Sequence, residues 1–187
     1  MTRRSLVRTA ALAAILAAPL AALVSTATAA EAEELSRQVT IRRTAYGVPH
    51  IQADSLRAVA FGFGYCQAED HLENIMRSML RARGELAKNF GGEDNVETDF
   101  WNRQFRVHRR AVETYHKLDA DFRSMLEGFA AGMNYYVARH RQSVPDWVPE
   151  ISGHDVASHG MTGVMRFAFD RRRIIRQFLQ SQGETVE

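Results

Sequence analysis

The chain has 187 residues, of which 45% are hydrophobic and 25% charged, so it predicts one ordinary globular domain and excludes a collagen-like or disordered protein. Its 24 basic and 22 acidic residues include Arg3, Arg4 and Arg8, without which 21 basic and 22 acidic residues remain, a net charge of −1. That balance argues against nucleic-acid binding, which usually needs a clustered basic excess, and the single cysteine, Cys66, excludes an internal disulfide and a Cys-x-x-Cys zinc site.

Residues 1–30 have the three-part layout of a secretory signal peptide. A basic start precedes an uncharged stretch rich in Ala and Leu at 9–24, and small residues follow at 27–30. Pro19 interrupts the apolar stretch, which is shorter than the roughly 20 residues that a membrane-spanning helix needs. We therefore expect a periplasmic or secreted protein without stable membrane insertion, whose mature chain is 31–187. The arginine pair fits a twin-arginine signal and an ordinary Sec signal equally well.

The first element of the mature chain is predicted to be extended, over residues 36–51. Val39 and Ile41 alternate with polar residues, and Pro49 marks an edge or a strand end. The pattern predicts a hairpin or two short strands. Because two strands alone are marginally stable in water, we expect the rest of their sheet to come from elsewhere.

Helical patterns fill the chain after Asp54. This residue is a suitable N-cap for a short helix over 54–60, and Gly62 and Gly64 predict the end of that helix. A long helix is predicted over 66–83. Its apolar stripe at helical spacing consists of Leu72, Ile75, Met76, Met79 and Leu80.

Three further helices are predicted beyond Gly84, which ends or bends the long helix. One lies within 101–115, one begins after the N-cap Asp119, and the last spans 154–182 after a rigid connection at 144–149. The helix after Asp119 is predicted to bury one face, made of Phe122, Met125, Leu126, Phe129, Met133, Tyr136 and Val137.

The seven histidines form no convincing metal site. Glu113 and His116 make one Glu-x-x-His motif, but a di-iron bundle needs two such motifs and two further glutamates. His154 and His159 are five residues apart, which places them on different faces of a helix rather than at the i, i+4 spacing that shares a zinc ion. We expect no metal ligand in this chain.

Charged residues near the start of the long helix are candidates for acid and base chemistry. Asp70 and His71 are adjacent, with Glu69 and Glu73 close by, but no Gly-x-Ser-x-Gly nucleophile accompanies them. Charged residues beside an amphipathic stripe usually form its solvated face, which is the favoured interpretation.

Three other features favour a structural interpretation over a functional one. Gly128 and Gly132 form a Gly-x-x-x-Gly on a charged helix, which predicts close helix packing in a soluble core rather than a membrane dimer. Cys66 is predicted to be buried, as free cysteines usually are. The basic run at 171–173 suggests salt bridges to a partner surface, with phosphate binding as the alternative.

Several segments resemble, in the same order, motifs of the penicillin amidase (penicillin acylase) family. They are Tyr-Gly-Val-Pro-His-Ile within 44–54, a glycine-rich run into Gln-Ala-Glu-Asp within 61–70, Arg-Gly-Glu-Leu at 83–86, and 126–134. Tyr46 and the surroundings of Cys66 are most similar to the aculeacin and acyl-homoserine-lactone acylase branch.

The resemblance implies an N-terminal-nucleophile hydrolase of αββα fold, made as one precursor, a zymogen that is cut into α and β chains. In that family a serine at the new N-terminus of the β chain attacks an amide, and its own α-amino group acts as the base. Residues 31–187 then form the α-chain region, an incomplete domain that is mostly α with a short N-terminal β element. The sequence stops at Glu187, about where an α chain would end. We expect no catalytic residue here, and no activity without the β chain as heterodimeric partner.

The resemblance also implies an acyl-binding pocket formed in part by Met165, Arg166 and Phe167. An Arg-Phe pair lines the pocket in the penicillin branch, and Arg166 and Phe167 match it. The alternative is that Phe167 is an ordinary core residue of an apolar stripe. The calcium-ligand glutamate of the penicillin branch falls at Arg173, which would repel a cation. We therefore expect neither calcium nor another metal or cofactor.

The predicted function is that of the α-subunit region of an exported amidohydrolase. Its substrates would be N-acyl small molecules, with acyl-homoserine lactones or lipopeptides first and penicillins second, in quorum quenching or antibiotic biosynthesis. The alternative is a truncated, non-enzymatic helical remnant or partner-binding module.

Overall fold

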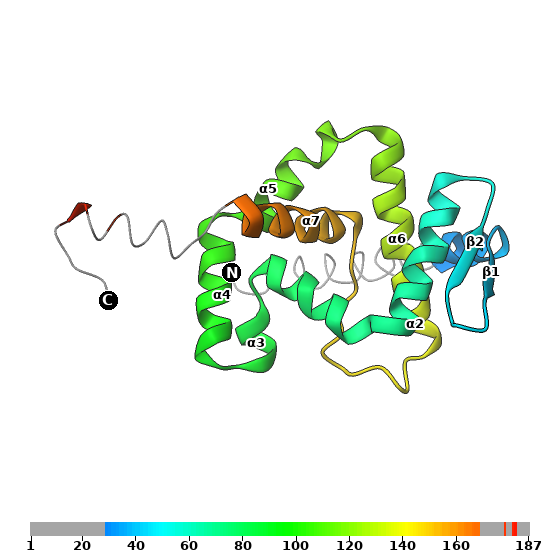
Figure 1. Ribbon diagram of the computed structural model, residues 1–187, viewed down its shortest axis with the longest axis horizontal. Helices are drawn as coiled ribbons and strands as arrows, with labels where there is room; N and C mark the ends of the chain where they lie inside the picture. The colour runs from blue at the N-terminus through cyan, green and yellow to red at the C-terminus, as the bar shows by residue number, and fades with distance from the viewer. Residues whose placement is uncertain (1–28, 169–177, 179–180, 183–187) are drawn as a thin grey trace, which may run out of the picture.

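The computed structural model describes residues 29–168, 178 and 181–182. In this part of the chain a two-stranded hairpin lies at one end of the molecule and the helices α3 and α4 at the other, with α2, α6 and α7 between them (Figure 1). None of the described helices is both long and apolar enough to span a bilayer. The mostly helical architecture with a short N-terminal β element agrees with the prediction.

The hairpin consists of β1 (Thr40–Arg43) and β2 (Pro49–Gln52), which pair antiparallel with Thr40 opposite Gln52. Two short strands were expected here, and Pro49 begins the second. The extended segment is shorter than predicted, because residues 29–37 are helical. Leu35 of this helical segment packs on Ala58 and Phe61, and that burial stabilises a helix that continues into the first two residues of the predicted extended segment.

Helix α2 (Leu56–Arg83) is one long helix rather than the predicted two, with a kink at His71. Its N-cap is Ser55, whose hydroxyl accepts a hydrogen bond from the backbone N of Ala58 (3.1 Å), and not Asp54. Gly84 ends α2 in the left-handed conformation (φ 72°), as predicted.

Gly62 and Gly64, which predict the end of a short helix, lie inside α2 instead. Since glycine has no Cβ, these positions allow neighbouring segments to approach the helix closely. Gly64 faces the backbone of Phe129, and Gly132 faces the carbonyl of Phe61, so a Cβ at either position would overlap a carbonyl oxygen. Gly62 lies beneath the hairpin, where a Cβ would overlap the side chains of Val39 and Ile51. The contacts at Gly64 and Gly132 join α2 to α6 (Ala120–Arg139) and confirm the close packing predicted for the Gly-x-x-x-Gly motif.

The segment between α2 and α6 contains more helices than the single one predicted. These are α3 (Leu86–Phe90), α4 (Glu93–Gln104), α5 (Val107–Thr114) and the 3₁₀ turn η1 (Tyr115–Lys117). The chain breaks between α4 and α5 because Arg106 adopts φ 54°, a left-handed conformation that ends a helix. The buried carboxylate of Asp99 accepts hydrogen bonds from the backbone N of Leu86 and Ala87, and so caps α3 from α4.

Helix α6 begins after the predicted cap, since the Asp119 carboxylate accepts a hydrogen bond from the backbone N of Asp121 (2.9 Å). Its inner face differs from the prediction in the first turns. Leu126 and Met133 are buried, but Phe122 is 48% exposed and Met125 is also exposed. These two residues lie where α6 extends beyond the helices that cover its later turns.

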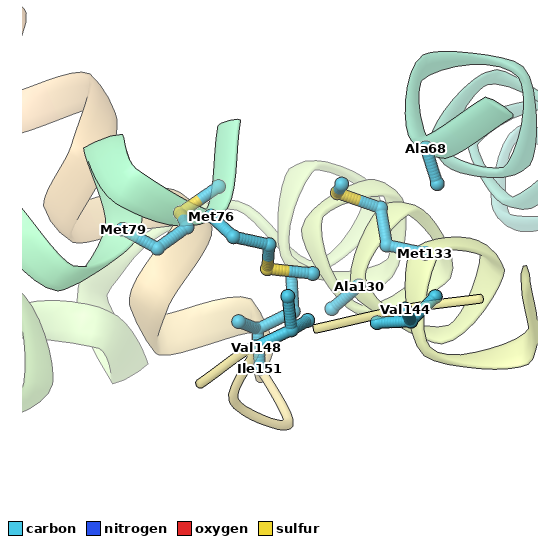
Figure 2. Packing of buried hydrophobic residues seen from close by; sticks show 8 residues of the cluster. All are labelled: Ala68, Met76, Met79, Ala130, Met133, Val144, Val148 and Ile151. Atoms are coloured by element: carbon cyan, nitrogen blue, oxygen red, sulfur yellow. The ribbon is translucent and has the colours of Figure 1, made fainter. Parts of the chain in front are cut away.

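The main core forms where α2, α6 and the connection before α7 (Gly153–Ala168) meet (Figure 2). Met76 and Met79 of α2 and Met133 of α6 are fully buried there, as predicted. The connection predicted at 144–149 contributes Val144 and Val148 to the same core. The last helix was predicted over 154–182, and the part of that prediction beyond Ala168 falls largely outside the described residues.

Candidate functional site

The start of α7 is held by a buried carboxylate, Asp155, which is 3% exposed. Arg83, the last residue of α2, donates from Nε to Asp155 Oδ1 (2.6 Å) and from Nη2 to the carbonyl of Glu150 (2.9 Å). Ser152 donates from its backbone N (2.8 Å) and its hydroxyl (2.9 Å) to Asp155 Oδ2. The Arg83–Asp155 pair therefore joins the end of α2 to the first turn of α7.

The surroundings of Asp155 favour its charged form. Burial by itself would raise the pKa of Asp155, but the hydrogen bonds from Arg83 and Ser152 outweigh that cost, and the pKa of this carboxyl is lowered. Asp155 is therefore a fixed anion that accepts hydrogen bonds, and not a proton donor near neutral pH.

His108 of α5 and Ser158 of α7 lie beside Asp155 and together resemble the parts of a hydrolytic triad. Nδ1 of His108 is 3.0 Å from the Ser158 hydroxyl and 3.8 Å from Asp155 Oδ1. A triad histidine contacts its serine through one ring nitrogen and its carboxylate through the other. Here both partners face the same nitrogen, Ser158 is 0% exposed, and its hydroxyl donates to the carbonyl of His154 (2.7 Å). The arrangement fixes α5 against α7 and offers no nucleophile to a substrate.

The predicted pocket residues lie on α7, about three turns beyond Asp155. Met165 is partly buried, and its neighbour Val164 is exposed. The side chains of Arg166 and Phe167 lie outside the described part of the structure, although their backbone is helical. The same helix thus carries the Arg83–Asp155 pair, called the clamp from here on, at one end and the predicted acyl-binding residues at the other.

The acidic residues considered for acid and base chemistry hold the hairpin instead. Arg43 of β1 donates to Asp70 (3.0 and 3.2 Å) and to Glu69, so both carboxylates are paired across 26 residues or more of sequence. Cys66, one turn before Asp70, is 1% exposed as predicted, and burial raises the pKa of its thiol. A raised pKa keeps the thiol protonated and unreactive.

Within residues 29–168 and the few described positions beyond, no three His, Cys, Asp or Glu side chains are grouped so that they could hold a metal ion. Glu113 pairs with Arg109 (2.7 Å) and Arg106 (3.3 Å), and the ring of His154 lies against that of Tyr115 (4.1 Å). Sequence patterns missed the Arg83–Asp155 and Arg43–Asp70 pairs, because no local spacing links residues so far apart in the chain.

Comparison with known proteins identifies what this architecture is similar to. The sequence profile of the penicillin amidase family matches residues 38–182. The chain is 35% identical over 129 residues to the acyl-homoserine lactone acylase PvdQ of Pseudomonas fluorescens, a match of 62% of this chain and 17% of that protein. It is 34% identical over 134 residues to the aculeacin-A acylase of Actinoplanes utahensis, again 62% and 17%.

One solved structure is also similar, a thermostable penicillin G acylase from Alcaligenes faecalis. Its TM-score is 0.59 at 27% identity, and the match covers 77% of this chain and 83% of the solved chain. The two chains are therefore of similar length. By contrast, this chain spans less than a fifth of the curated relatives named above.

Proposed function

The chain belongs to the penicillin amidase family, and on that premise we propose that it is the α-subunit region of an exported amidohydrolase that cleaves the amide bond of N-acyl compounds. The observation that carries the proposal is the family match over 38–182, joined to a solved acylase chain of similar length. The relatives are acylases by name, so the family is one of hydrolases.

In this proposal the reaction is divided between two chains. A larger chain, the β chain, supplies an N-terminal serine whose hydroxyl attacks the amide carbonyl while its α-amino group takes the proton. The described residues of the present chain fit the supporting role, because the Ser158–His108–Asp155 group is geometrically unsuited to nucleophilic attack. The hairpin of four-residue strands likewise fits a sheet that the larger chain completes.

The contribution of the present chain to substrate binding is a wall of the acyl pocket, formed by Met165, Arg166 and Phe167 on α7. The Arg83–Asp155 pair supports this role, since it fixes the start of that helix against α2. A helix held at a buried charge cannot slide along its axis without breaking that pair. The depth of the pocket thus follows from where α7 is anchored.

The substrates proposed are fatty-acyl amides, namely acyl-homoserine lactones or lipopeptides, with penicillins second. The names of the two curated relatives support this order. Residues 1–30 act as the export signal and are removed, so that the mature heterodimer works in the periplasm or outside the cell. Neither a metal nor another cofactor takes part.

Co-expression tests the proposal. Residues 31–187 are co-expressed with a larger chain. This larger chain is the part of the Actinoplanes aculeacin-A acylase that the present chain does not match, and it begins at the nucleophilic serine of that acylase. The copurified pair should release fatty acid from aculeacin A and from long-chain acyl-homoserine lactones. A matched pair in which that serine is replaced by alanine should assemble and release none.

A second variant tests the pocket residues. Phe167→Ala should change the preferred acyl length while amide cleavage persists, because loss of the ring enlarges the pocket without altering the nucleophile. If Phe167 is an ordinary core residue, the variant lowers the yield of the pair and leaves the chain-length preference unchanged. A wild-type pair that assembles but hydrolyses no amide would instead favour the partner-binding module without enzymatic activity.

A further inference from the structure

The tip of the hairpin exposes apolar side chains to an unusual degree. Tyr46 is 95% exposed and Val48 is 54% exposed, and both lie in the turn between β1 and β2 at one end of the molecule (Figure 1). Within the described part of the chain, Tyr46 contacts no other side chain through a ring interaction, hydrogen bond or ion pair. Its ring therefore contributes almost nothing to the packing of the described residues.

The turn that carries Tyr46 is nevertheless held by its own hydrogen bonds. The backbone N of Gly47 donates to the carbonyl of Thr44 (2.9 Å), and the backbone N of Thr44 donates to the carbonyl of Val48 (3.1 Å). Gly47 has φ 79°, a conformation that glycine adopts without strain. The main chain on both sides of Tyr46 is thus restricted to one conformation.

Arg43 then fixes the turn to the body of the molecule. Its Nη1 donates to the carbonyl of Gly47 (2.7 Å), and the same guanidinium binds Asp70 and Glu69 on α2. One side chain therefore joins the turn to a helix that is part of the main core. The exposed ring of Tyr46 extends from a support that is itself rigid.

A rigid, exposed aromatic side chain has the properties of an interface anchor. Tyrosine buries a large area with few rotatable bonds, and an anchor that is ordered before binding loses little conformational entropy when it docks. We propose that Tyr46, with Val48 beside it, is the anchor through which the hairpin docks into an apolar pocket of the larger chain of the same enzyme. This inference rests on the proposed function, because that proposal supplies the partner.

The comparisons favour the larger chain as the occupant of this surface. The present chain is similar in length to one chain of a solved penicillin G acylase, yet its match spans only 17% of the two curated relatives named above. Most of the relatives' length is therefore available to cover the hairpin. Among the described residues the two strands of the hairpin pair only with each other, so one partner surface can pair with a strand edge and receive the ring of Tyr46.

The test uses the co-expressed pair and a matched aromatic control. Tyr46→Ala should weaken association of the two chains at least tenfold, measured as the amount of larger chain that copurifies. Phe100→Ala should change it less than twofold, since Phe100 is 57% exposed at the opposite end of the molecule, on α4, and packs on its neighbour Trp101. Equal association of Tyr46→Ala and wild type would overturn the proposal, and so would an equal loss in both variants.

Photo-crosslinking identifies the occupant directly. With p-benzoylphenylalanine at position 46, the crosslinked product should contain the larger chain, and with the same residue at position 100 it should not. A product made of two copies of the present chain, or a wild-type pair that does not associate, would overturn the inference. A pair that crosslinks at position 46 but hydrolyses no amide would contradict the proposed function alone.

Discussion

The clamp at the start of α7 and the turn at the tip of the hairpin are both built on an arginine that binds carboxylates far away in the sequence. At the clamp the pair is enclosed: the side chains of Arg83 and Asp155 are 22% and 4% exposed. At the turn, Arg43 and its partners lie at the surface, and the residue they support, Tyr46, points away from the chain. The same chemistry therefore stabilises the fold in one region and presents a side chain in the other.

The largest expected effect comes from breaking the enclosed pair. Asp155→Ala leaves the charge of Arg83 without its partner and should lower the free energy of unfolding by about 3 kcal/mol, the lower end for a broken buried pair because Arg83 is partly exposed. Urea titration of the copurified pair, followed by circular dichroism, measures this change. Glu113→Ala removes an exposed pair of similar length, and its loss of stability should be much smaller because solvent screens surface ion pairs. Equal losses would show that enclosure is irrelevant.

Two glycine substitutions compare the same two regions by backbone. Gly132→Ala places a Cβ against the carbonyl of Phe61, and such overpacking should cost about 1–3 kcal/mol. Gly47→Ala meets no atom within 4 Å but must hold a left-handed φ, which should cost about 1–2 kcal/mol. In the same urea titrations, the loss at Gly132 should exceed the loss at Gly47. The reverse order would mean that α2 and α6 separate easily.

Part of the pH dependence of stability should also originate at the clamp. The pKa of Asp155 is lowered in the folded state, so its contribution is complete above the unfolded value of about 3.9 and is lost as pH falls through the folded value. The difference in unfolding free energy between wild type and Asp155→Asn should therefore be constant from pH 7 to about pH 5 and shrink below pH 4. A difference that stays constant down to pH 3 would contradict the lowered pKa.

The smallest effect on stability is expected at the turn. Arg43→Met should change the free energy of unfolding only slightly, because exposed ion pairs contribute little. The same variant should weaken association with the larger chain severalfold, since the support of Tyr46 becomes mobile. Arg43→Lys should recover part of the association by keeping one charged contact. A large loss of stability with unchanged association would show that Arg43 serves the fold rather than docking.

Sequence patterns predicted the features that depend on neighbouring residues. The hairpin, the cap at Asp119, the end of α2 at Gly84 and the burial of Cys66 all follow from composition within a few positions, and the structure confirms them. Gly62 and Gly64 misled the prediction because a glycine that ends a helix and one that admits a close neighbour are identical in sequence. The exposure of Phe122 was missed for a related reason, since periodicity marks an apolar face but not whether anything covers it.

The sequence by itself determined that this chain is mostly helical, has a β-hairpin ahead of its long helices and carries the motifs of the penicillin amidase family. Those properties rest on local hydrogen bonding, on side-chain periodicity and on short runs of residues. Only the tertiary structure decided that Arg83 meets Asp155, that Arg43 meets Asp70, and that Tyr46 is left without a contact in the described part of the chain. These outcomes depend on how α2 packs against its neighbours, and that packing is decided by the whole core rather than by any one segment.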